Sequence, residues 1–216
     1  IKPVQMLYMK KILTILILLF PFLVNAQQFI TKGKIEFERK INVHKQFEGE
    51  GEWIQELKKT IPQYNITYFN FFFDGEKSIY KPGRENPDKS REMDWGQGPA
   101  RENIILNNYQ DQSFIGQKQV FETMYLVQDS MRKINWKYTS DTRKIAGFNC
   151  RKATGIIMDS VFVFAFFTDE IIVTGGPEGF NGLPGMILGI AIPRIHTTWF
   201  ATKVELAEIS PKDLVA

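Results

Sequence analysis

The sequence predicts a mainly β fold, formed by a single curved antiparallel sheet or a half-open barrel with at most one or two short helices. Three patterns predict it: alternation of apolar and polar residues near the N-terminus, a hairpin turn at Asp74-Gly75, and short apolar segments that recur along the rest of the chain. Alternation with period two is typical of a half-buried strand, and regularly spaced short strands are typical of an antiparallel architecture.

The alternation is clearest over residues 34–44, KIEFERKINVH. One parity carries Ile35, Phe37, Ile41 and Val43, with Arg39 as the exception, and the other carries Glu36, Glu38, Lys40 and Asn42. Successive side chains of a strand point to opposite faces, so we predict a strand with one buried face.

The next segments predict a short helix and then a hairpin. Within residues 47–61, the apolar residues Trp53, Leu57 and Ile61 are four apart, which fits one face of a helix that ends before Pro62. Residues 65–80 place Asp74-Gly75 between aromatic and β-branched runs, and glycine tolerates the positive φ that a tight hairpin turn requires.

Strand-like segments then recur every 8 to 12 residues, and none of the rest of the chain favours a long helix. The predicted strands are residues 103–109, 113–123, 125–129, 135–139, 146–157, 160–168, 186–192 and 198–208.

The first 26 residues predict a cleavable secretory signal peptide. Lys10 and Lys11 precede the apolar run 12–24, and small or moderate side chains lead to a cleavage site after Ala26. The run has 13 residues, fewer than the roughly 20 that span a bilayer. An uncleaved anchor is the alternative; with cleavage we expect no transmembrane anchor to remain.

Residues 27–216 suit one β domain, with residues 81–102 as a long surface loop that is rich in Pro and Gly and lacks periodicity. The whole chain has 27 Lys and Arg against 24 Asp and Glu. The first 26 residues hold three of the lysines and no acid, so the mature domain is neutral and gives no reason to expect nucleic-acid binding. Cys150 is the only cysteine, which excludes an internal disulfide.

The stretch 175–190, GGPEGFNGLPGMILGI, crowds glycine and proline beside apolar residues. A phosphate cradle is disfavoured, because residues 175–192 contain no Lys, Arg, Ser or Thr and Glu178 would repel an anion. A membrane insertion is disfavoured by the glycines and the proline. We expect a structural corner: two tight turns, Phe180 anchored in the core, Gly185 at positive φ and a buried strand from Met186. A ligand contact by the same loop stays compatible with this.

These residues also resemble a known family. Gly182-Leu183-Pro184-Gly185-Met186-Ile187 is similar to the motif that names the GLPGLI (Porph_ging) family, with Met186 in place of the usual Leu. The segments 145–153, 168–171 and 133–136 resemble its "IxGYxCxKA", "T-x-E-I" and "KIxW" elements. The family-motif residues to which we assign a structural or binding role are Gly176, Pro177, Phe180, Gly182, Leu183, Pro184 and Gly185.

The resemblance implies an exported, largely β protein of Bacteroidetes-type bacteria that is associated with the cell envelope, in some cases near outer-membrane receptor genes. It implies no established enzyme activity and lends no catalytic residues. An outer-membrane receptor or another envelope protein is therefore the expected partner, with an apolar ligand as a further possibility.

The residues that could carry chemistry form no recognisable constellation. His44 and His196 belong to no H-x-x-x-H pair, and Cys150 has no C-x-x-C partner, so we expect neither metal nor cofactor. Asp169 and Glu170 are adjacent, which in a strand sends them to opposite faces and weakens a paired acid/base site.

Two aromatic runs, residues 68–73 and 161–167, are apolar on both parities. Either these strands are covered on both faces, or one face lines an apolar groove. The function we predict is therefore a non-enzymatic envelope protein, located in the periplasm or at the outer membrane, that binds a protein partner or an apolar ligand through its sheet. The alternatives are an assembly factor without a ligand, and a hydrolase or redox enzyme that uses Cys150, Asp169, Glu170 or His196.

Overall fold

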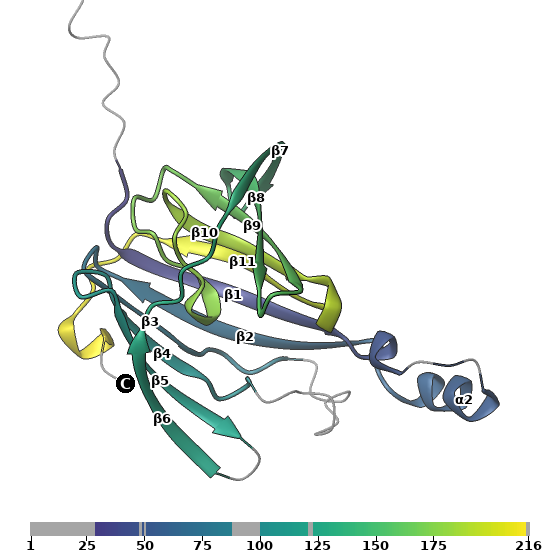
Figure 1. Cartoon of the computed structure of the whole chain (residues 1–216). Helices are drawn as coiled ribbons and strands as arrows, with labels where there is room; N and C mark the ends of the chain where they lie inside the picture. Colours follow the sequence, from purple (N-terminus) through teal and green to yellow (C-terminus); the bar gives the residue numbers. More distant parts are fainter. Residues whose placement is uncertain (1–28, 48, 50, 88–99, 121–122, 215–216) are drawn as a thin grey trace, which may run out of the picture.

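The computed structural model describes residues 29–47, 49, 51–87, 100–120 and 123–214 (Figure 1). The predicted signal peptide, residues 1–26, lies outside the described residues, and so does most of the predicted surface loop. Within the described part, no helix is long and apolar enough to cross a membrane.

The predicted mainly β fold is confirmed: in the described part of the chain, eleven strands form one open antiparallel sheet in the order β6-β5-β4-β3-β2-β1-β11-β10-β9-β8-β7. The strands are β1 (Gly33–Asn42), β2 (Tyr64–Phe73), β3 (Lys77–Pro82), β4 (Ile104–Asn108), β5 (Ser113–Val120), β6 (Thr123–Ser130), β7 (Lys137–Ile145), β8 (Phe148–Ile157), β9 (Val161–Thr168), β10 (Met186–Ile192) and β11 (Thr197–Glu205). Figure 1 shows the sheet strongly bent, with β1, β10 and β11 at its centre and β6 and β7 at its two edges.

The helical part is small and lies at the periphery. The helix α2 (Glu52–Thr60) confirms the predicted helix, and Figure 1 shows it projecting away from the sheet. It buries none of its residues, and Trp53 is 71% exposed. The short 3-10 turns are η2 (Val43–Gln46), η4 (Pro177–Gly179), η5 (Pro193–Ile195) and η6 (Pro211–Leu214).

Strand boundaries differ from prediction at several places, of which three matter for the fold. Strand β1 ends at Asn42, because Val43 enters the turn η2. Strand β3 extends to Pro82, two residues into the predicted loop. Strands β7 and β8 are separated by a turn in which Ala146 and Gly147 both have positive φ. Alanine rarely adopts that conformation, so residue preferences do not predict this turn.

The face that we call the inner face carries the core. Its side chains follow cross-strand rows, such as Val127, Gly116, Ile105, Tyr80, Phe71 and Ile35 in one half of the sheet and Tyr138, Ala153, Ala165, Ile190 and Trp199 in the other. Phe71 and Phe37 are fully buried and pack edge to face, with ring centroids 6.2 Å apart. The inner face therefore supplies the hydrophobic stabilisation of both halves.

The opposite, outer face is neither fully buried nor an open apolar groove. Its aromatic side chains are half-buried beneath cationic ones: Lys81 lies 5.0 Å from the ring centre of Phe72, and Arg143 lies 4.5 Å from that of Phe200. The long alkyl stems of lysine and arginine shield apolar surface while their charges stay in water. This cover explains how residues 68–73 and 161–167 can carry apolar side chains on both parities.

The burial difference between neighbouring phenylalanines gives a direct test. We expect Phe71→Ala to lower the free energy of unfolding by about 3–5 kcal/mol, because it removes a fully buried ring and leaves a cavity. Phe72→Ala, on the outer face of the same strand, is the matched control and should cost about 1 kcal/mol. Urea denaturation measures both, and equal losses would contradict the assignment of the two faces.

Candidate functional site

Residues 171–185, which we call the plug loop, cover the inner face between β9 and β10. Ile171, Val173, Phe180 and Leu183 are buried in the hydrophobic core. The backbone of the loop bonds to the start of β10, since Met186 N donates to Ile171 O at 3.0 Å and Ile187 N donates to Gly175 O at 2.8 Å. The sheet has no helix against this face in the described residues, so the plug loop acts as its second layer.

Glycine is required where the plug loop approaches other groups. A Cβ atom on Gly175 would meet the Tyr109 hydroxyl and the ring of Phe71, and one on Gly176 would meet the side chain of Ile187. Gly185 has the positive φ that the sequence predicts, +135°, and a Cβ there would collide with the carbonyl of Thr168. Close backbone approach therefore explains the crowding of glycines.

Two residues of opposite charge, the buried Arg39 of β1 and the half-buried Glu178 of the plug loop, lie close enough to interact electrostatically. Arg39 is 5% exposed on the inner face, beside Trp199 of the neighbouring strand β11. Its Nε and Nη1 atoms have no hydrogen-bond partner, and neither does the inaccessible Oε1 of Glu178 in the plug loop. Oε2 of Glu178 accepts a hydrogen bond from Asn103 Nδ2 at 2.9 Å. Orphaned buried polar atoms of this kind mark a place where water or a ligand group can be held.

Burial dominates the electrostatics of this pair. Desolvation raises the pKa of Glu178, and the Asn103 hydrogen bond and the charges of Arg39 and Lys118 oppose that shift only in part. Desolvation likewise lowers the pKa of Arg39, although the charge of Glu178 works against it. The Tyr80 hydroxyl, which accepts a hydrogen bond from Trp199 Nε1 at 3.2 Å, has a raised pKa, first because of burial and then because of the nearby Glu178.

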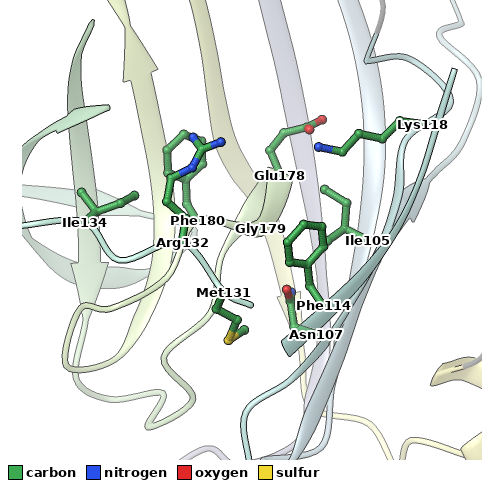
Figure 2. Close-up of a pocket in the computed structure, with 10 residues that line it drawn as sticks. All are labelled: Ile105, Asn107, Phe114, Lys118, Met131, Arg132, Ile134, Glu178, Gly179 and Phe180. Atoms are coloured by element: carbon green, nitrogen blue, oxygen red, sulfur yellow. The ribbon is translucent and has the colours of Figure 1, made fainter. Parts of the chain in front are cut away.

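A pocket opens between the plug loop and strands β4 and β5, with a void of about 80 Å³ (Figure 2). It is lined by Ile105, Asn107, Phe114, Lys118, Met131, Arg132, Ile134, Glu178, Gly179 and Phe180. Figure 2 shows Phe114 and Ile105 on one side and Phe180 and Arg132 on the other, while Lys118 extends toward Glu178. The pocket thus combines apolar walls with two cations and one buried carboxylate.

A segment that crosses the inner face completes the wall of the pocket. Residues 131–136 run from the end of β6 to the start of β7, that is, from one sheet edge to the other. Trp136 Nε1 donates to Asn181 O of the plug loop at 2.9 Å. The strand that the sequence predicts at residues 135–139 is shifted: residues 135 and 136 belong to this crossing segment, and β7 runs from Lys137 to Ile145.

The four residues of the enzymatic alternative do not form one site. Cys150 is fully buried, and burial raises its pKa to about 12, with a smaller contribution from the charge of Glu170. Asp169 is paired with Arg151, with Oδ2 and Nη2 3.1 Å apart. His196 follows the C-terminal end of β10, whereas Asp169 and Glu170 precede its N-terminal end. A seven-residue strand, about 20 Å long, therefore separates them.

The other candidate ligands are also dispersed. His44 lies in η2, not at the end of a strand, and its Nε2 is 3.1 Å from the carbonyl oxygen of Ile61. Among the described residues, no group of three or more His, Cys, Asp or Glu side chains could hold a metal ion.

Sequence reasoning missed Arg39 as a site residue and treated Glu178 only as a charge that repels anions. Both carried a signal. Arg39 breaks the apolar parity of β1, which a solvent-facing arginine would not do, and Glu178 is the one charged residue in the stretch 175–192. Opposite charges that interrupt two buried segments are candidates for a buried pair.

Comparison with known proteins agrees with the motif. Residues 156–189, which include the whole plug loop, match the model of Porph_ging, described as a protein of unknown function. The predicted resemblance to this family is confirmed over that segment. The Porph_ging segment comprises the end of β8, β9, the plug loop and most of β10. No curated protein sequence matches the chain.

The fold also has solved neighbours. The structures of PNGF-II in two crystal forms, space groups C2 and P21, align with TM-scores of 0.55 and 0.56 at 16% sequence identity. The alignments cover 85% and 86% of this chain but only 29% and 30% of the PNGF-II chains. At this identity the likeness concerns the fold alone, over less than a third of the length of PNGF-II.

Alanine substitutions at two glycines distinguish the cost of an unfavourable φ from the cost of a steric clash of the new methyl group. We expect Gly185→Ala to cost about 3 kcal/mol or more, because the methyl group would strike Thr168 O and the φ is unfavourable. Gly147→Ala, at φ +94° with nothing within 4 Å of the new methyl group, carries only the conformational cost of about 1–2 kcal/mol. Thermal and urea unfolding measure both, and similar losses would show that the plug loop is not tightly seated.

The buried carboxylate predicts a pH dependence. The pKa of Glu178 is higher in the folded than in the unfolded chain, so its contribution to stability is full below the unfolded pKa and is lost as pH rises through the folded pKa. The unfolding free energy of the wild type minus that of Glu178→Gln should therefore fall as pH rises from about 4. Urea titrations at a series of pH values give this difference; a difference that is flat or grows with pH contradicts the burial of the charge.

Proposed function

We propose that this chain is an exported cell-envelope protein that binds an apolar group of an envelope partner or ligand at the pocket between the plug loop and β4–β5. The signal-like residues 10–26 and the family resemblance support export and an envelope location. An outer-membrane receptor, or another envelope protein, is the proposed partner. The proposal assigns a binding role, without catalysis, to the inner face of the sheet.

The observation that carries the proposal is the composition of the pocket. Ile105, Phe114 and Phe180 give it apolar walls, and burying an apolar group there is favourable by about 25 cal/mol for each Å² removed from water. Arg132 lines the same pocket and has no ion pair within the described residues. Apolar walls with few polar groups are typical of binding sites.

The buried charges beside the pocket give it polar specificity. Oε1 of Glu178 is inaccessible and unpaired, although Glu178 lines the pocket. When the Glu178 side chain turns toward the pocket, a bound group can donate a hydrogen bond to this oxygen, which removes the cost of leaving it unsatisfied, about 1–3 kcal/mol. The preferred occupant is therefore an apolar group that carries a hydrogen-bond donor.

The enzymatic alternative has no comparable support. A nucleophile needs a base within hydrogen-bond reach and a lowered pKa, whereas the pKa of Cys150 is raised. The pair Asp169 and Glu170 lies at the other end of β10 from His196. The proposed binding role needs none of these four residues.

The pocket can be tested by capture of partners from the envelope fraction of the producing bacterium. Immobilised wild-type protein should retain a specific protein or lipid, identified by mass spectrometry, and Phe114→Asp should lower its recovery at least tenfold, because a carboxylate would then occupy an apolar wall. Phe162→Asp is the matched control, since Phe162 is 54% exposed on β9 and does not line the pocket.

Recovery that is unchanged in Phe114→Asp would show that another surface binds, and recovery that falls equally in Phe162→Asp would show a general loss of solubility or folding. Circular dichroism of both variants separates the second outcome from loss of the site. Failure of every preparation to retain any molecule would contradict the proposed function itself.

A further inference from the structure

The edge strand β6 is exposed along its whole length. All eight residues, Thr123 to Ser130, are exposed, and Leu126 is 74% and Tyr125 51% exposed. Its pairing with β5 runs through eight residue pairs without a register shift. Among the described strands, none pairs with the outer side of β6, which therefore presents backbone donors and acceptors without sheet partners, flanked by apolar side chains from Met124 to Val127.

The opposite edge of the sheet is protected by several features. Strand β7 has a register irregularity between Tyr138 and Thr142, and its sequence KYTSDTRKI carries four charged residues. One of them, Asp141, pairs with Lys152 at 2.9 Å. Charges and bulges are the features that prevent edge strands from pairing with other chains. The sequence of β6, TMYLVQDS, has a single charged residue, Asp129, near its end.

We propose that β6 is a dimerisation edge that pairs antiparallel with β6 of a second copy of this chain. A two-fold axis perpendicular to the sheet at Leu126 places Leu126 opposite its own copy. Each residue before Leu126 then lies opposite the residue that is equally far after Leu126 in the second copy. Both strands then keep their inner faces on the same side, so two bent sheets join into one. This interaction goes beyond the proposed ligand site and does not depend on it.

The side chains of β6 are complementary to themselves in this register. On the face of Leu126, the two copies of Leu126 meet and Met124 lies opposite Gln128. On the inner face, Tyr125 lies opposite Val127, a pairing of aromatic and β-branched residues that stabilises antiparallel sheets. Asp129 lies opposite Thr123 and never faces its own copy, so no like charges meet.

The contrast between the two edges of the sheet also favours a closed dimer through β6 over an open filament of many copies. Pairing of β6 with β7 of the next molecule would be heterologous and would generate filaments. The charges and the irregular register of β7 oppose that arrangement, whereas β6 with β6 closes at two copies. Pairing with a strand of a different protein would not require the side chains of β6 to be complementary to those of a second β6.

The oligomeric state of the chain from residue 27 onward tests the proposal. Sedimentation or light scattering from about 1 µM to about 1 mM should show a reversible dimer. Leu126→Lys should raise the dimer dissociation constant at least tenfold, because it places two like charges opposite each other. Met158→Lys is the matched control, since Met158 is also 74% exposed but lies between β8 and β9, and it should leave the dimer unchanged.

A cysteine at the two-fold axis tests the register. Directly opposite residues of an antiparallel pair have Cα atoms about 4.5 or 5.5 Å apart, within the range of a disulfide. Leu126→Cys should therefore form a covalent dimer under mild oxidation, and Met158→Cys should not. The native Cys150 is buried and does not interfere.

Three outcomes overturn the proposal. A wild type that stays monomeric over the whole range excludes the dimer, a dimer that persists in Leu126→Lys places the interface elsewhere, and a dimer in which Leu126→Cys fails to crosslink excludes this register. Circular dichroism of Leu126→Lys shows whether the β5–β6 hairpin stays folded. If it unfolds, crosslinking of Leu126→Cys decides alone.

Discussion

The structure depends on one constraint: a bent single sheet buries its inner face only if something fills the bend. Apolar side chains such as Phe37, Phe71 and Trp199 line that face from both halves. No helix or second sheet covers it in the described residues, so backbone segments must do so. A loop that covers the core must form hydrogen bonds with its own backbone N–H and C=O groups, and its backbone must also approach the core side chains closely. The plug loop meets both demands, through its bonds to β10 and through glycines at its tightest contacts.

The same constraint explains why polar residues gather at one place. The core is interrupted by the buried Arg39 and the half-buried Glu178 rather than filled by hydrocarbon. Opposite charges in such a place are weak evidence for stability, because the desolvation of two charges can exceed their mutual attraction. Glu178 also lines the apolar pocket, so the same small region of the inner face holds both the unpaired polar atoms and the proposed binding site.

The sequence predicted the architecture well, because local signals decide it. Alternation identified β1, the Asp74-Gly75 turn identified the β2–β3 hairpin, and the strand from Met186 to Ile192 had its observed bounds. The turn at Ala146 and the crossing segment 131–136 were not foreseen, because tertiary contacts select their backbone conformations against residue preference. The pocket was unforeseeable for a related reason: its walls come from β4, β5, the crossing segment and the plug loop, which are distant in sequence and meet only when the sheet bends.

The pairing of β1 with β11 affects when the chain can fold during its synthesis. The central pair of the sheet joins the first strand to the last, and Ile30, just before β1, bridges to Ile171 in the plug loop. A topology dominated by such distant contacts folds slowly, because the entropy of closing long loops is lost before the stabilising contacts form. The nascent chain cannot complete its core until its C-terminal third has been synthesised. Under the proposed export, the same delay would keep the polypeptide unfolded, and so competent for passage through a translocation channel.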